Sequence, residues 1–244
     1  MIRTVTFDFW QTLLADSPEN LDRSKRLRVE GIGELLARTG HPVSVAELET
    51  AHEATGRALE AVWREHRDVS SREQVRIFLD AASPGLASRL SDDTLERVVE
   101  AYATPALHFP PLPSPGALEA VRALAGLGIQ LCVISNTGRS PGVVLRKVLD
   151  RYGLLGHFSV LTYSDEVGYR KPHPRIFHET LKRAGSDPAQ AVHVGDNPVD
   201  DVVGAQGAGM RAIHFSPAGG ASPSERADAV AVHLGLLPEL IRAF

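Results

Sequence analysis

The sequence predicts an α/β fold, in which a doubly wound parallel sheet carries an all-helical domain inserted after its first strand. Short, nearly continuous apolar runs recur along the chain, and helical stretches separate the later ones, at 129–135, 158–163, 191–196 and 211–216. A first run, RTVTFDF, covers 3–9. Strands that are buried on both faces have this pattern, and their alternation with helices indicates a parallel sheet.

The boundaries of the later elements follow from turn and capping residues. The segment AVAVHL at 229–234 is a further strand candidate. Three pairs place a capping side chain before a proline and therefore predict helix starts at Ser114-Pro115, Ser140-Pro141 and Asn197-Pro198. These signals alternate with the apolar runs as a doubly wound sheet requires.

The segment 16–108 interrupts this rhythm because its pattern is wholly helical. The stretches SVAE at 44–47 and SREQ at 71–74 predict capping boxes, and the proline-rich HFPPLPSPG at 108–116 predicts a return linker. We therefore predict a catalytic core of residues 1–15 and 109–244 and a helical cap domain of residues 16–108. The cap is expected above the carboxyl ends of the strands, where open α/β sheets bind ligands, and to act as a lid.

Composition narrows the classes of function. The chain has 43% hydrophobic and 23% charged residues and a net charge of -4, which gives no basic footprint for nucleic acid. Its single cysteine, Cys132, cannot form an internal disulfide, and no apolar run approaches the ~20 residues of a membrane span. We expect a cytoplasmic protein with no membrane or nucleic-acid partner, either a monomer or a homodimer.

Polar residues follow the predicted strands at their carboxyl ends. Because the ends of parallel strands meet at one edge of a sheet, these side chains should converge on one crevice. They are Asp8 and Thr12, Ser135 and Asn136, Lys171, and Asp196, Asp200 and Asp201. This set suits phosphoryl transfer: an aspartate attacks phosphorus, carboxylates hold Mg²⁺, and lysine and hydroxyl donors offset charge on the transferring group.

The motifs DFWQT, SNT, RKP and GDNPVDD, in this order, resemble those of the haloacid dehalogenase superfamily with a helical C1-type cap. The resemblance implies a Rossmann-like core and Mg²⁺ as cofactor. It implies Asp8 as nucleophile, with Lys171 and Asp201 as further catalytic residues. Binding of substrate phosphate would involve Thr12, Ser135, Asn136 and Lys171, and the metal ligands would be Asp8, Asp196 and the main-chain carbonyl of Trp10.

Several of these residues keep a simpler interpretation. Asp200 in the first turn of a helix is better explained by the helix dipole, whereas for Asp201 a functional role is modestly favoured. Thr12 stands equally between a local loop bond and phosphate binding. His173 is expected to cap a helix or lie on the surface. Basic residues of the insert are as well explained by a solvated helix face and are not assigned; these are Arg23, Arg26, Arg28, Arg64, His66 and Arg67.

Trp10 departs from the phosphatase pattern. Phosphatases of the superfamily usually carry a general acid–base aspartate at this position, and an indole can neither give nor take a carboxyl proton. Haloacid dehalogenases also lack that acid, but they generally lack the aspartate that matches Asp196. The leading hypothesis is therefore a Mg²⁺-dependent phosphatase acting on a small phosphorylated metabolite. A 2-haloacid dehalogenase and a non-catalytic binding or regulatory protein remain alternatives.

Overall fold

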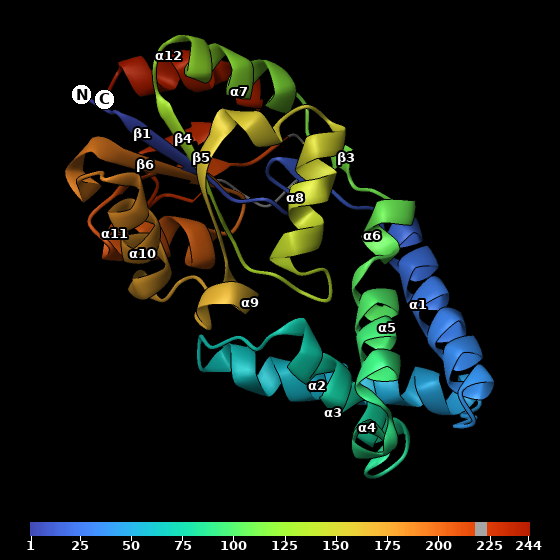
Figure 1. Cartoon of the computed structure of the whole chain (residues 1–244). Coiled ribbons are helices and arrows are strands. Elements are labelled where there is room, and N and C mark those ends of the chain that lie inside the picture. The colour runs from blue at the N-terminus through green and yellow to red at the C-terminus, as the bar shows by residue number, and fades with distance from the viewer. Residues whose placement is uncertain (218–223) are drawn as a thin grey trace.

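A six-stranded parallel sheet lies at the centre of the molecule, which we describe from a computed structural model over residues 1–217 and 224–244. The strands lie in the order β5-β4-β1-β6-β7-β8, as expected for a doubly wound α/β fold (Figure 1). Each of the six predicted apolar runs contains one of them: β1 (Thr4–Phe7), β4 (Gln130–Ser135), β5 (Phe158–Tyr163), β6 (Ala191–Gly195), β7 (Arg211–Phe215) and β8 (Ala229–Ala231).

The register of the central strands brings the polar residues of the motifs together. Phe7 of β1 pairs with Val133 of β4 on one side and with Val194 of β6 on the other. The amide of Asp8 then donates to the Val194 carbonyl at 2.9 Å, so Asp8 is held at the end of the pairing. The carboxyl ends of β1, β4 and β6 therefore meet at one edge of the sheet.

Helices cover both faces of the sheet. On one face α7 (Ala117–Gly126), α8 (Gly142–Arg151) and α12 (Leu237–Arg242) pack on side chains such as Phe7 and Val133. On the other face α10 (Pro174–Ala184) and α11 (Gly204–Gly207) pack on Ile134 and Ala191. This double cover explains why the strands are apolar at almost every position. The short α9 (Ser164–Val167) follows β5.

Six helices form a layer beside the carboxyl edge of the sheet, which we call the helical layer (Figure 1). They have a hydrophobic core of their own, which includes Leu36, Leu48 and Phe78. The helices are α1 (Pro18–Arg38), α2 (Val45–Arg64), α3 (Ser71–Ala82), α4 (Leu86–Arg89), α5 (Asp92–Ala103) and α6 (Pro105–His108). All of them fall within the segment 16–108. No helix in the described part of the chain is both long and apolar enough to cross a membrane.

A small antiparallel pair of strands joins the two ends of the helical layer to the core. It pairs β2 (Leu14–Ala15) with β3 (Leu112–Pro113), so the chain leaves the core and returns to it at the same place. Between β1 and β2 the chain makes a tight turn, in which Leu14 donates to the Phe9 carbonyl at 3.0 Å and Gln11 has a positive φ of 57°. This turn carries Trp10.

The capping predictions have mixed outcomes. The box at Ser44 and Glu47 is confirmed, and Asn197 caps the turn that begins at Pro198. Ser114 and Ser140 do not start helices: α7 begins after Gly116, which is in the left-handed region at φ 80°, and α8 begins after Pro141. The α8 start uses a distant carboxylate instead, since Asp165 Oδ1 accepts from the Gly142 amide at 3.1 Å. The cap of α3 is Ser70, one residue before the predicted Ser71.

Candidate active site

Asp8 lies at the centre of the site, immediately after β1, and is only 6% exposed. Its Oδ1 accepts a hydrogen bond from Lys171 Nζ at 2.6 Å. The same ammonium donates to Asp201 Oδ1, also at 2.6 Å. Lys171 is itself buried, so this one cation bridges two carboxylates that are 193 positions apart in the chain.

The backbone of Lys171 is fixed by the Asn136 side chain, which forms hydrogen bonds with both its amide and its carbonyl. Asn136 Oδ1 accepts from the Lys171 amide at 2.8 Å, and its Nδ2 donates to the Lys171 carbonyl at 3.1 Å. The same Nδ2 donates to Asp200 Oδ2 at 3.1 Å. Asp200 therefore does more than stabilise a helix dipole, because it also holds the loop that orients the lysine.

Asp196 and Asp201 complete an acidic cluster with Asp8. One ligand oxygen from each of the three carboxylates lies within 4.8 Å of the others. Asp196 Oδ1 accepts from Thr12 Oγ1 at 3.3 Å, and Asp201 Oδ2 accepts from the Asn197 amide at 2.9 Å. Thr12 is thus tied to the acidic cluster and not only to its own loop.

Gly195 is required by the packing of Asp201 over the end of β6. A Cβ at this position would lie 2.1 Å from Asp201 Cγ. Such a contact is far inside van der Waals distance, so any side chain at position 195 would displace the carboxylate. The glycine that ends β6 therefore makes room for the charge that Lys171 requires.

The electrostatics of the cluster show a shortage of positive charge. Burial raises the pKa of Asp8 to about 7, against the attraction of Lys171 and with added repulsion from Asp201. Burial, followed by repulsion from Asp201, raises the pKa of Asp196 to about 6. Burial also disfavours ionised Asp201, but Lys171 and the hydrogen bond from His193 hold its pKa well below the usual range. Lys171 is thus the one cation hydrogen-bonded within a described cluster of three carboxylates.

This donor set fits a hard divalent cation. Mg²⁺ prefers oxygen ligands and is commonly held by one or two carboxylates together with substrate oxygens and water. Burial and repulsion from Asp201 raise the pKa values of Asp8 and Asp196, and the attraction of Lys171 offsets this rise only in part. A divalent ion would supply that charge, so the residues present fit the group.

Sequence reasoning missed the residues that support Asp201 from within the sheet. His193 Nε2 lies 3.0 Å from Asp201 Oδ1, and its Nδ1 lies 2.7 Å from Thr6 Oγ1. Burial lowers the pKa of His193, and an ionised carboxylate only accepts, so the neutral ring donates from Nε2 and accepts from Thr6. The available signal was two polar residues inside apolar strands, and β1 and β6 pair Thr6 directly with His193.

Ser135 and Trp10 are the two remaining predicted site residues. Ser135 is the last residue of β4 and is fully buried, with its Oγ 3.4 Å from the Asn136 carbonyl. Trp10 is half-buried and packs edge-on against Phe9, with ring centroids 4.9 Å apart. Its indole lines a cavity and makes no contact that would let it replace an acid.

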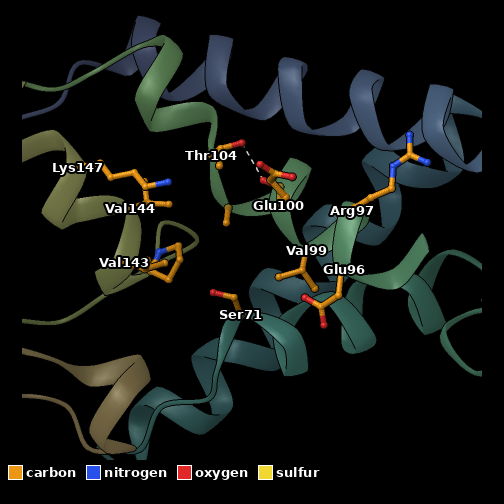
Figure 2. A pocket seen from close by; sticks show the side chains of 11 residues that line it. Ser71, Glu96, Arg97, Val99, Glu100, Thr104, Val143, Val144 and Lys147 are labelled. Atoms are coloured by element: carbon orange, nitrogen blue, oxygen red, sulfur yellow. Dashed lines mark hydrogen bonds between the residues drawn. The ribbon is translucent and has the colours of Figure 1, made fainter. Parts of the chain in front are cut away.

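Two cavities open where the helical layer faces the core. The first, of about 520 Å³, is lined by Trp10 and Asn136 from the site and by Arg28 and His52 from the helical layer. The second, of about 360 Å³, lies between α5 and α8 and is lined by residues such as Glu100 and Lys147 (Figure 2). Of these two, the first has site residues in its wall, and we refer to it as the candidate substrate cavity.

A further buried carboxylate, Asp68, joins the helical layer to the core. Its Oδ2 accepts from Arg170 Nη1 at 2.8 Å, and its Oδ1 accepts from Trp63 Nε1 at 3.0 Å. Ser164 and Thr137 of the core also donate to Oδ2. The Arg170 guanidinium also lies 4.3 Å from the centroid of the Trp63 ring, so Arg170 of the core contacts both Asp68 and Trp63. No sequence motif predicted this network.

The basic residues left unassigned in the sequence separate clearly in the structure. Arg28 is buried at 5% exposure, whereas the other five are exposed. Those five are Arg23, Arg26, Arg64, His66 and Arg67. His173 caps α10, since its side chain accepts from the Arg175 amide, which confirms the capping interpretation.

The family model, the curated relatives and the solved structures that resemble this chain all point to the same family. Residues 2–209 match the family described as haloacid dehalogenase-like hydrolase. A phosphoserine phosphatase of Thermus thermophilus is 30% identical over 226 residues, which cover 87% of this chain and 88% of the relative. Haloacid dehalogenase-like hydrolase domain-containing protein 3 of Xenopus laevis is 39% identical over 104 residues, or 42% of this chain, and the match spans only 41% of that relative's length.

Among solved structures, a 2-haloacid dehalogenase from Pseudomonas syringae pv. Tomato superposes with a TM-score of 0.71 and 29% identity. The superposition covers 100% of this chain and 99% of that one. A HAD phosphatase from Thermococcus onnurineus has a TM-score of 0.63 and 24% identity over 98% of both chains, which supports the shared fold. This chain belongs to the haloacid dehalogenase-like hydrolase family.

Proposed function

We propose that this protein is a Mg²⁺-dependent phosphatase that hydrolyses a small phosphorylated metabolite through an aspartyl phosphate on Asp8. The observation that carries the proposal is the buried Asp8 bound to Lys171 beside two further carboxylates. The phosphatases among the relatives support it. In this proposal residues 16–108 form a cap domain over a core of residues 1–15 and 109–244.

The reaction would proceed in two displacements at phosphorus. A carboxylate oxygen of Asp8 attacks the phosphorus, the bond to the leaving oxygen breaks, and that oxygen keeps the electron pair. Water then attacks the phosphorus of the aspartyl phosphate, which releases inorganic phosphate and restores the carboxylate. Lys171 offsets the charge of both the nucleophile and the phosphate, while Thr12, Ser135 and Asn136 would bind phosphate oxygens.

The metal site would use Asp8, Asp196 and the main-chain carbonyl of Trp10. Bound Mg²⁺ would supply positive charge that keeps the carboxylates ionised and offsets charge on the phosphoryl oxygens. Asp201 acts as a positioning residue in this scheme. Its two oxygens accept from Lys171 and from the Asn197 amide, so it fixes the ammonium beside the nucleophile.

Trp10 shapes the range of leaving groups. A general acid contributes typically about 10²–10⁴-fold to a rate, and the indole supplies no such proton. The enzyme should therefore act best on esters whose leaving oxygen needs little protonation. The indole lines the substrate cavity, where it is placed to pack on the organic part of the substrate.

A second function is favoured by one observation. A 2-haloacid dehalogenase needs no proton for its leaving halide, so Trp10 would be no handicap, and the Pseudomonas structure resembles this chain over its whole length. In that reaction Asp8 attacks the carbon that carries the halogen, halide leaves, and water hydrolyses the ester. A binding or regulatory protein is the third possibility, and the complete set of Asp8, Lys171 and Asp196 weighs against it.

The proposal is tested by measuring phosphate release from a broad panel of phosphate esters, with Mg²⁺ and after treatment with a chelator. We expect release that requires Mg²⁺ and disappears in Asp8→Asn, whereas Asp150→Asn, an exposed carboxylate on α8, keeps it. A parallel assay follows halide release from 2-chloropropionate. Halide release without metal and no phosphate release would establish the second function, and failure of both with no Mg²⁺ binding would establish the third.

A further inference from the structure

The substrate cavity is lined by three arginines, and two of them, Arg28 and Arg139, have no carboxylate partner among the described residues. Arg28 comes from α1 of the helical layer, and Arg139 comes from the core loop that follows β4. That loop begins at Asn136, which lines the same cavity and orients Lys171. The wall of this cavity, of about 520 Å³, therefore includes Trp10 and Asn136 of the site as well as both arginines, and its size suits a small metabolite.

Arg28 is a buried cation that lacks a counter-ion. Its Nε donates to the Tyr102 carbonyl at 2.7 Å, and within the described residues no carboxylate lies within 4.0 Å of its guanidinium. Burial, and then the charge of Arg139, lower the pKa of Arg28 to about 10. A buried charge without a counter-ion costs free energy, so its retention calls for an explanation.

Arg139 is held toward Arg28 by the helical layer. Its Nε donates to His52 Nε2 at 2.8 Å, and its Nη2 donates to the His52 carbonyl at 2.9 Å. Burial, and then the charges of Arg139 and Arg28, lower the pKa of His52 to about 3, so the ring is neutral and adds no repulsion. Neither bond to His52 neutralises the guanidinium.

The other charges of the cavity leave this pair uncompensated. Arg170 is paired with Asp68, and Lys25 lies 3.5 Å from Glu53. Two carboxylates also line the cavity, Asp16 and Asp22, but within the described chain neither forms an ion pair with a lining arginine. The Arg28 guanidinium also lies 5.1 Å from the centroid of the Tyr102 ring, an aromatic contact that supplies no negative charge.

We propose that Arg28 and Arg139 form a subsite for a second anionic group of the substrate, a carboxylate or a second phosphate. The inference rests on the proposed function and narrows it: the substrate is a small phosphate monoester that carries another oxyanion at its far end. Guanidinium groups suit this task because their planar N–H groups bind carboxylate or phosphate oxygens in pairs. Since the two arginines belong to different layers, such a substrate would also hold the helical layer against the core.

The test is a binding measurement on Asp8→Asn protein, so that it does not depend on turnover. The probes are 3-phosphoglycerate and glycerol 3-phosphate, which differ in a carboxylate against a hydroxymethyl group. Calorimetry should give a Kd for 3-phosphoglycerate about tenfold or more below that of glycerol 3-phosphate. Fructose 1,6-bisphosphate against fructose 6-phosphate tests the second phosphate in the same way, and the pair with the larger ratio identifies the oxyanion.

The preference is assigned to the arginines by adding Arg28→Gln or Arg139→Gln to the Asp8→Asn protein. Each should reduce the ratio of the two Kd values to about twofold or less, while Arg38→Gln, an exposed arginine at the end of α1, should preserve it. Circular dichroism checks the fold, and Arg139→Gln serves alone if Arg28→Gln fails to fold. Equal affinities for both members of each pair, or Kd ratios unchanged in a folded arginine variant, would overturn the subsite. Neither result would bear on the proposed phosphatase activity, which the phosphate-release assay tests separately.

Discussion

Two buried carboxylates in this molecule, Asp201 and Asp68, have very different surroundings. Asp68 accepts from an arginine, an indole and two hydroxyl groups, and Arg170 is its ion-pair partner. Asp201 shares a single lysine with Asp8, and Asp196 completes its acidic cluster. Burial alone therefore does not distinguish the candidate active site from the Asp68 junction. The candidate active site is distinguished by its excess of carboxylates over cations.

The largest effect is expected from Lys171→Met. Removing the one cation leaves buried carboxylates unpaired, which typically costs about 3–5 kcal/mol, and also removes the proposed stabiliser of the phosphoryl group. Urea unfolding should show this loss, and phosphate release should fall below detection. Lys147→Met, at an exposed position of α8, is the control. Unchanged stability in Lys171→Met would mean that the cluster does not depend on its lysine.

Asp68→Asn should lower stability but leave the metal site intact. The change weakens the bonds from Arg170 and Ser164 and should cost about 1–3 kcal/mol. Because Asp68 is not part of the acidic cluster, Mg²⁺ affinity by calorimetry should stay within about twofold of wild type. Asp196→Asn should do the reverse and lower Mg²⁺ affinity. If Asp68→Asn weakens Mg²⁺ binding as much as Asp196→Asn does, the two sites are not separate.

Stability of the metal-free protein should fall as pH rises from about 4 to 7. Asp8 and Asp196 have raised pKa values of about 7 and about 6, so the folded state holds their protons in this range and the unfolded state does not. Their stabilising contribution is complete below the ordinary aspartate pKa and is lost as pH passes through the raised values. Thermal unfolding should record a falling Tm that excess Mg²⁺ reverses. A flat profile in Asp8→Asn would assign most of the slope to Asp8.

The smallest effect concerns Trp10→Asp, which offers the missing acid. If the indole only occupies the place of that acid, turnover of alkyl phosphates should rise by about tenfold or more, with little change for nitrophenyl phosphate. Steady-state kinetics with both ester types measures the difference. An equal fall for the two would show that the indole packs against substrate, and it would then count as part of the substrate cavity.

The sequence predicted the sheet edge well because parallel strands must end together. Asp8, Asp196 and Lys171 could be grouped from their places after apolar runs, and the structure brings them together. The sequence could not predict that Arg28 would line the cavity or that Asp68 would join the helical layer to the core. Their partners come from elements whose relative placement depends on packing between the helical layer and the core, and no local pattern encodes that placement.

Smaller errors have the same physical origin. Ser140 resembled a helix cap, but the start of α8 is stabilised by Asp165 from a segment that follows β5. His193 lies within an apolar strand that carries no local motif for it, and its ring joins Thr6 to Asp201. In each case a contact across a large sequence separation replaced or supplemented a local one, as tertiary structure commonly does.

The loop 136–140 connects the helical layer to the lysine of the site. At one end Asn136 holds the backbone of Lys171, and further along Gly138 and Arg139 bond to Gln74 and His52 of the helical layer. A movement of the layer that broke the bonds to Gln74 and His52 would also disturb the loop that aligns the lysine. The position of the layer and the alignment of Lys171 are therefore coupled through this one loop.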